Sequence, residues 1–313
     1  MKLLYLLQAI AQNAQAGAAA GPPPEHGFSL AEAFFELIQF IGWFLAVGAI
    51  GFRYGIVRHM RGISDDARRI LAADNAAVLG LLGAVLLLIS FLGKPLLELL
   101  TTHQAFSELL PRNRGQFAVR QSMILIASVA FLVVRAAPRV GWPIAALTMM
   151  VAVLFPLYTG RGAGKVNAVH ILAASTWLGT LLVLTTVGIR GVIRRGAAGT
   201  SRAELVCDLV NSFSPLALTA ATVVALTGLT TAWMHLKRLS ALWTTAYGVT
   251  LMIKLVFVLI VVTLGAWNWR RVRPSLGNEG TEETIRRSAT TELAFGAIVL
   301  LCTAVLVTLP SPR

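Results

Sequence analysis

The chain has 313 residues, of which 56% are hydrophobic and only 13% are charged. With a mean hydropathy of +0.73, this composition excludes an ordinary soluble domain and indicates an integral membrane protein. The formal net charge of +13 does not indicate nucleic-acid binding, because the basic residues separate apolar runs instead of clustering on one polar face. We therefore expect membrane lipids, and no nucleic acid, to contact these residues.

The sequence carries no motif of a known catalytic site. It contains no HExxH pattern, no Ser-His-Asp pattern and no paired catalytic carboxylates, and GRGAGK at 160–165 lacks the spacing of a phosphate-binding loop. The two cysteines, Cys207 and Cys302, are far apart and form no CxxC motif, so both are interpreted as small helix residues. We therefore do not expect an enzyme.

The first residues resemble a bacterial signal peptide. Lys2 precedes a short apolar stretch and then small residues with AQA at 14–16, followed by the linker GPPPEHG. The apolar stretch is too short to span a bilayer, which takes about 20 residues. Residues 1–29 are therefore expected to form a signal-like or interfacial segment with a linker.

The rest of the chain predicts an all-α, polytopic transmembrane helical bundle of about eight spans. The apolar runs show no alternation typical of strands, and a helix satisfies its own backbone hydrogen bonds in lipid. The expected spans are 30–55, 75–101, 117–137, 141–159, 166–192, 211–236, 241–269 and 288–309. They divide into a four-span N-terminal membrane half, 30–160, and a four-span C-terminal membrane domain, 161–313.

The connections after the first, third, fifth and seventh spans carry most of the Lys and Arg residues. The positive-inside rule therefore places both termini outside the cytoplasm. In this orientation His170, His235, His103 and His26 lie toward the outside, and only His59 is cytoplasmic.

The fifth span begins with HILAASTWLGT, in which His170, Ala173, Ala174 and Trp177 share one helix face. Small residues allow a neighbouring helix to approach closely, and polar groups in membranes usually face the bundle interior. His170 is therefore either a metal or heme ligand near the outer surface or a histidine bonded to a neighbouring helix.

The sixth span has a polar stripe of Thr227, Thr231 and His235, with Met234 beside the histidine. Because the fifth and sixth spans are antiparallel, we expect His170 and His235 at comparable depths. Two imidazoles and a thioether suit copper. The alternatives are hydrogen bonding between helices for the threonines and packing for Met234.

Two ionisable residues lie within the last two spans. A charge at the position of Lys254 costs roughly 2.5 to 3.5 kcal/mol, so this side chain should face the interior or a wet cavity. Glu292 lies nearer the cytoplasmic end, so a direct pair with Lys254 is not expected. A polar track from the outer histidines past Lys254 to Asn268 and Glu292 and a purely structural network are both compatible with the pattern.

Three segments of the C-terminal half, in this order, resemble the copper resistance protein D (CopD) family. They are HILAASTWLGTLLVL, FSPLALTAATVVALTGLTTAWMHL and LWTTAYGVTLMIKLVFVLIVVTLGAWNWRRVRP, followed by a last helix with TEL and a TLP end, and the resemblance covers about 165–310. It implies a bacterial inner-membrane protein that moves copper from periplasm to cytoplasm, alongside a CopC-like periplasmic copper-binding partner. It also implies that His170 is a functional residue.

The expected site combines these residues. His170 and His235 are the expected copper ligands, and His103 and Met234 are candidates to complete the site. Trp177, Thr227, Thr231 and Tyr247 would shape it, and Lys254 and Glu292 would line or gate a path. Two other functions use the same residues: a membrane b-type cytochrome with bis-histidine heme, and a non-transporting membrane scaffold.

Overall fold

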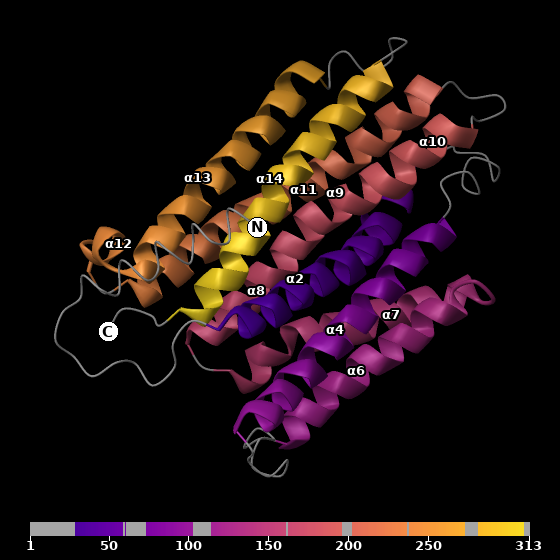
Figure 1. Ribbon diagram of the computed structural model, residues 1–313. Coiled ribbons are helices and arrows are strands. Elements are labelled where there is room, and N and C mark those ends of the chain that lie inside the picture. Colours follow the sequence, from indigo (N-terminus) through magenta and orange to yellow (C-terminus); the bar gives the residue numbers. More distant parts are fainter. Residues whose placement is uncertain are drawn as a thin grey trace.

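The computed structural model describes residues 29–58, 60, 73–102, 114–160, 162–195, 202–236, 238–272 and 281–309. These residues form helices joined by short connections, without a strand among them (Figure 1). The N-terminal half contains α2 (Leu30–Gly51), η1 (Phe52–Val57), α4 (Ala73–Thr102), α6 (Arg114–Val133) and α7 (Pro138–Thr159). The C-terminal half contains α8 (Ala163–Ala174), η2 (Ser175–Gly179), α9 (Thr180–Val183), η3 (Leu184–Ile189), α10 (Arg190–Arg195), α11 (Arg202–His235), α12 (Ala241–Thr244), α13 (Ala246–Trp267), η4 (Asn268–Val272) and α14 (Thr281–Thr308). The η segments are π-helical.

Eight helices of the described chain are long and apolar enough to cross a membrane. They are Leu30–Val57, Asn75–Leu97, Gly115–Val133, Pro138–Thr159, Ala163–Ile193, Glu204–His235, Ala246–Arg270 and Thr284–Thr308. The predicted helical bundle and its multi-pass membrane character are thus confirmed. The sixth span starts before the expected residue 211, because the helix continues through a polar turn that contains Asp208.

The spans alternate in direction, so their ends gather at two ends of the bundle (Figure 1). We call the end at which α8 begins and α11 finishes the histidine end. The opposite end, with η1, α10 and η4, is called the arginine end.

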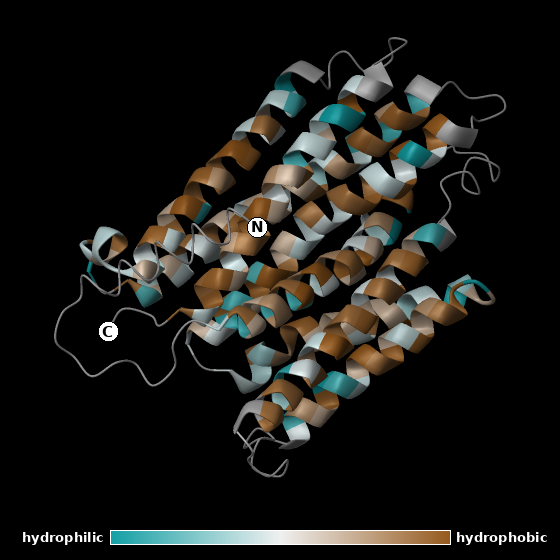
Figure 2. Ribbon diagram, viewed as in Figure 1, coloured by the Kyte–Doolittle hydropathy of each residue, from teal (hydrophilic) through white to brown (hydrophobic). Residues whose placement is uncertain are grey.

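Hydrophobic residues are distributed along all the spans (Figure 2), and many large hydrophobic side chains are exposed on the outside of the bundle, as a bilayer requires. Exposed tryptophans lie near both ends of the bundle: Trp233 and Trp243 at the histidine end, and Trp267 and Trp269 at the arginine end. Tryptophan is enriched at the two membrane interfaces, where its amphipathic ring meets the headgroups. These rings therefore mark the boundaries of the membrane-embedded zone around α11 and α13.

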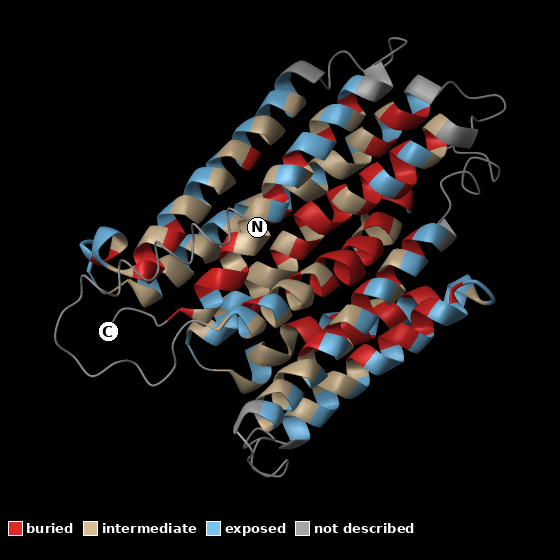
Figure 3. Cartoon of the chain, viewed as in Figure 1, coloured by how far each residue is buried: buried red, intermediate tan, exposed pale blue. Residues whose placement is uncertain are grey.

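The core lies where α2 packs against the fifth span, and Figure 3 shows buried residues concentrated there. The contact depends on two glycines that face each other. A Cβ built on Gly48 would lie 2.3 Å from the carbonyl carbon of Gly179, and a Cβ on Gly179 would lie 2.2 Å from the carbonyl oxygen of Phe44. The two backbones therefore touch, which only residues without a side chain permit.

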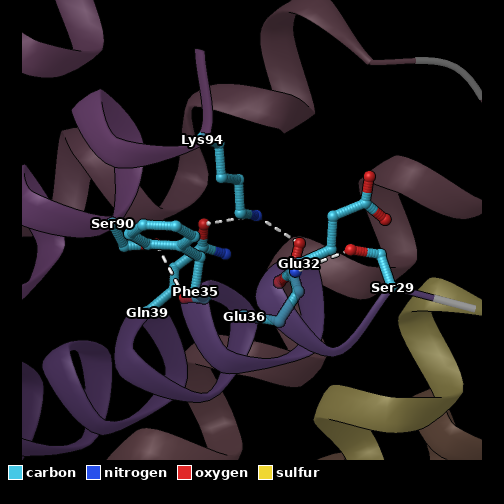
Figure 4. A network of polar contacts seen from close by, with 7 residues as sticks. All are labelled: Ser29, Glu32, Phe35, Glu36, Gln39, Ser90 and Lys94. Carbon is cyan, nitrogen blue, oxygen red and sulfur yellow. Dashed lines mark hydrogen bonds and ion pairs between the residues drawn. The ribbon is translucent and has the colours of Figure 1, made fainter. Parts of the chain in front are cut away.

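An ion pair joins α2 and α4 near the histidine end (Figure 4). Lys94 donates to the Glu36 carboxylate and lies 3.5 Å from Oε1 of Gln39. One turn away the Ser90 hydroxyl donates to the Phe35 carbonyl at 2.7 Å. Because both charges lie partly buried between spans, this pair links the two helices instead of pointing into solvent.

We expect that removing one partner of this pair destabilises the protein more than removing both. Lys94→Met leaves the Glu36 carboxylate without its ammonium, which should cost about 3 kcal/mol of unfolding free energy, as for other broken buried pairs. The double variant Lys94→Met/Glu36→Gln leaves no charge and should recover much of that loss. Thermal unfolding midpoints of the purified proteins measure both, and additive losses would contradict the coupling.

Candidate metal-binding site

His170 lies on α8, two turns from the beginning of the helix, and faces α11. Its Nδ1 is 2.9 Å from Oγ1 of Thr227. A Cβ built on the next residue, Gly228, would lie 3.3 Å from Cε1 of the imidazole. The ring therefore lies directly on the backbone of α11, and the predicted contact between the histidine and a neighbouring helix is present.

The hydrogen bonds of Thr227 determine which nitrogen of His170 carries the proton. The threonine hydroxyl donates its one proton to the Val223 carbonyl at 2.6 Å. Its oxygen therefore accepts the hydrogen bond from His170, so Nδ1 is the protonated nitrogen. Nε2 keeps its lone pair, which is the form of histidine that ligates metals.

His235 reaches the same state by a different route. Its Nδ1 lies 2.8 Å from the carbonyl oxygen of Thr231, one turn back on α11. A carbonyl only accepts hydrogen bonds, so Nδ1 carries the proton and Nε2 has the free lone pair. The ring is stacked on Tyr247, with centroids 6.0 Å apart and planes at 15°.

The junction of α12 and α13 positions Tyr247. The Thr245 side chain caps α13 by accepting a hydrogen bond from the Gly248 amide at 3.0 Å. A Cβ on Gly248 would lie 2.0 Å from the carbonyl oxygen of Ala241, so the α12 turn rests on the backbone at this glycine. This close contact holds the tyrosine ring beside His235.

Both histidines lie within about two turns of the histidine end, as expected from their antiparallel spans, but they do not lie directly opposite each other. His170 contacts Thr227 and Gly228, whereas His235 is the last residue of α11, about 11 Å further along at 1.5 Å per residue. The difference arises because α8 begins at Ala163, so His170 lies inside its span. The imidazoles therefore form an outer and an inner tier.

Between the tiers lies Thr231, whose hydroxyl is buried and has no hydrogen-bond partner in the described structure. Met234 is 43% exposed, and its methyl group lies 3.6 Å from the Cβ position of Gly162 at the beginning of α8. His103 lies outside the described residues. The described part of the chain brings together no group of three or more His, Cys, Asp or Glu side chains that could hold a metal.

Lys254, on α13, is partly buried and within electrostatic range of both His170 and Cys302. Cys302 is fully buried on α14. Lys254 is thus the charged neighbour of the inner tier, and Cys302 lies in turn beside Lys254. Sequence reasoning interpreted Cys302 as a small helix residue and did not associate it with Lys254, which is 48 residues earlier in the chain.

Trp177 and Glu292, which were expected near the same path, line a different cavity closer to the arginine end, together with Asn268. Neither histidine, nor Lys254, lines that cavity. The structure therefore separates the predicted polar residues into two groups.

Sequence reasoning also missed the environment of Arg120. It lies within the third span, with its guanidinium 4.5 Å from the ring centroid of Phe91 and 5.5 Å from that of Trp43. Its Nε donates to the Ala152 carbonyl at 3.1 Å. Stacking on aromatic faces offsets part of the cost of burying the cation.

The direct contact between His170 and α11 bears on the heme alternative. With Cε1 so close to Gly228, no macrocycle fits between the ring and α11 on that side. The protonated Nδ1 atoms leave each histidine one ligating nitrogen, Nε2, which is the arrangement that both copper and heme iron require.

Comparison with known proteins points to copper. The family model "Copper resistance protein D" (CopD) matches residues 208–306. The copper transport protein CutJ of Bacillus subtilis (strain 168) is 29% identical over 143 residues, which are 46% of this chain and 24% of that protein. The chain thus matches about a quarter of the length of this curated relative. No solved structure matches, and nothing in these matches supports heme.

Proposed function

We propose that the chain binds copper at its histidine end and moves it from the periplasm to the cytoplasm, because residues 208–306 match the family model of copper resistance protein D. In this proposal the histidine end faces the periplasm, consistent with the distribution of basic residues. A CopC-like periplasmic protein delivers the ion.

One observation carries the proposal: Nδ1 of each imidazole lies within hydrogen-bond distance of an internal oxygen, at 2.9 Å for His170 and 2.8 Å for His235, which makes Nε2 the nitrogen with a lone pair for a metal. Metal-ligating histidines almost always donate their other nitrogen to an oxygen acceptor, which fixes the tautomer and the ring orientation.

The tiers suggest an order of transfer. Copper first meets His235 and the thioether of Met234, which favours Cu(I). The buried hydroxyl of Thr231 lies on the way to His170 and offers the ion a weak oxygen contact. Lys254 lies beside the inner tier, and its positive charge opposes long residence of a cation there.

The experiment compares copper accumulation in cells that express the wild type, His170→Ala or His235→Ala at equal membrane levels. Each variant is expected to lose most of the copper accumulation that the wild type produces. Unchanged copper content with properly inserted His170→Ala would favour a scaffold without transport.

Thr227 provides a finer test of the same site. Thr227→Val removes the acceptor that orients His170 and should weaken copper binding by about 10–100-fold, as for other residues behind a metal ligand. Thr227→Ser keeps the hydroxyl and is the matched control, expected to bind as the wild type does. Competition with a chromophoric copper chelator measures both affinities, and equal losses in the two variants would argue against an orienting hydrogen bond.

A further inference from the structure

A cavity of about 320 Å³ lies between the spans of the C-terminal half, closer to the arginine end than the histidines. Residues of α11, α13 and α14 and of the fifth span form its walls, and most of them are apolar. Its volume falls at the lower end of the range of small-molecule sites, which combine apolar walls with a few convergent polar groups.

The polar groups of this cavity converge on one carboxyl group. Glu292 is 5% exposed, and its Oε2 accepts a hydrogen bond of 3.3 Å from Nδ2 of Asn268. The Ser288 hydroxyl donates to Oδ1 of the same asparagine. Asn268 is therefore held in one orientation and presents its amide to the carboxylate.

The other carboxylate oxygen, Oε1, lies beside Gly265 of α13, where a built Cβ would be 3.4 Å away in ordinary van der Waals contact. The partner that the described residues give this carboxyl group is an uncharged amide, that of Asn268. A buried carboxyl group without a countercharge is costly to ionise in a membrane interior, so a cation bound beside Glu292 would supply the charge that stabilises its ionised form.

The walls of the cavity are locally irregular. The η2, η3 and η4 segments contribute Trp177, Leu184 and Asn268 to the lining. Single π-helical turns inside α-helices occur frequently at functional sites. In addition, α11 and α13, which frame the cavity, are the least buried of the eight described spans, so a lipid-soluble molecule can reach it from the bilayer.

We propose that this cavity binds an amphipathic organic cation, whose ammonium group bonds to Oε1 of Glu292 and whose apolar body fills the space beside Trp177 and Phe213. Copper does not fit this site, because its polar groups are hard oxygens and an amide, without imidazole or sulfur. The site is thus independent of the histidine tiers, and its test is independent of theirs.

The test measures binding of phenylbutylammonium and of its neutral isostere phenylbutanol to the protein in lipid nanodiscs, by calorimetry with empty nanodiscs subtracted. The wild type should bind the ammonium at least ten-fold more tightly than the alcohol. Glu292→Gln keeps the shape and the bond from Asn268 but removes the charge, and should abolish this preference.

A second variant keeps the test informative if the first one fails to fold. Ala217→Phe fills the cavity from α11 and leaves Glu292 intact, so it should weaken binding of both compounds by at least ten-fold. Equal affinity of the wild type for the ammonium and the alcohol, or an unchanged preference in Glu292→Gln, would overturn the proposal. So would full binding by Ala217→Phe.

Discussion

Purified His170→Ala should bind copper more than about 100-fold more weakly than the wild type, since losing a ligand costs at least as much as losing the residue that orients it. The imidazole has one nitrogen fixed by Thr227 at 2.9 Å and the other free, so alanine removes the only ligating atom that the inner tier presents from α8. Competition with a chromophoric chelator, under reducing and oxidising conditions, measures the loss for each oxidation state.

The outer tier provides a comparison within the same experiment. His235→Ala should retain the inner site and therefore lose less affinity than His170→Ala, while slowing the rate at which copper is acquired. Tyr247→Phe keeps the stacked ring and is expected to behave as the wild type. Wild-type affinity in His170→Ala would show that copper binds elsewhere.

The second large effect is expected at the contact between α2 and the fifth span. Gly48→Ala places a Cβ 2.3 Å from the backbone of Gly179, and a backbone cannot move aside as a side chain does. Overpacking usually costs about 1–3 kcal/mol, and the loss here should reach or exceed the upper end of that range. We expect a reduced yield of monodisperse protein and a lower unfolding midpoint, measured by size exclusion and thermal unfolding.

Gly164 is the matched control for this prediction, because a Cβ there meets nothing within 4 Å. Gly164→Ala also replaces glycine within an apolar helix and should be neutral or slightly stabilising. If Gly48→Ala were as stable as Gly164→Ala, the two helices would have to lie further apart than the structure has them.

The spans themselves could be predicted because their signal is local. A run of about 20 apolar residues fixes a membrane helix whatever it packs against, and all eight expected spans are present. The polar stripe of Thr227, Thr231 and His235 was predictable for the same reason, because helical period places these residues on one face.

The relative depth of the histidines was not predictable to better than two turns. Hydrophobic windows do not locate the first residue of a helix, and α8 begins at Ala163, before the apolar run. Trp177 lies in the π-helical segment η2, whose wider turn changes the direction of the side chains that follow α8. Trp177 therefore lines the cavity nearer the arginine end instead of the expected site near His170.

The exact partners of polar side chains on different helices could not be predicted from the sequence either. The sequence predicts ion pairing among Lys94 and Glu98 of the second span and Glu32 and Glu36 of the first, and in the structure Lys94 bonds to Glu36 on α2. Helical spacing predicts partners on the same helix. Whether a side chain bonds to such a partner or to one on another helix depends on which helix face meets the neighbour. Arg120 had no such local signal, because its partners are rings on two other spans.

The most direct test of the copper site is X-ray absorption at the copper edge of the loaded protein. If copper binds to Nε2 of His170 and His235, the outer atoms of the two imidazole rings should produce outer-sphere scattering in the wild-type spectrum. This scattering should be reduced in His170→Ala and absent in His170→Ala/His235→Ala. A wild-type spectrum without imidazole scattering, or one that the double substitution leaves unchanged, would contradict the account.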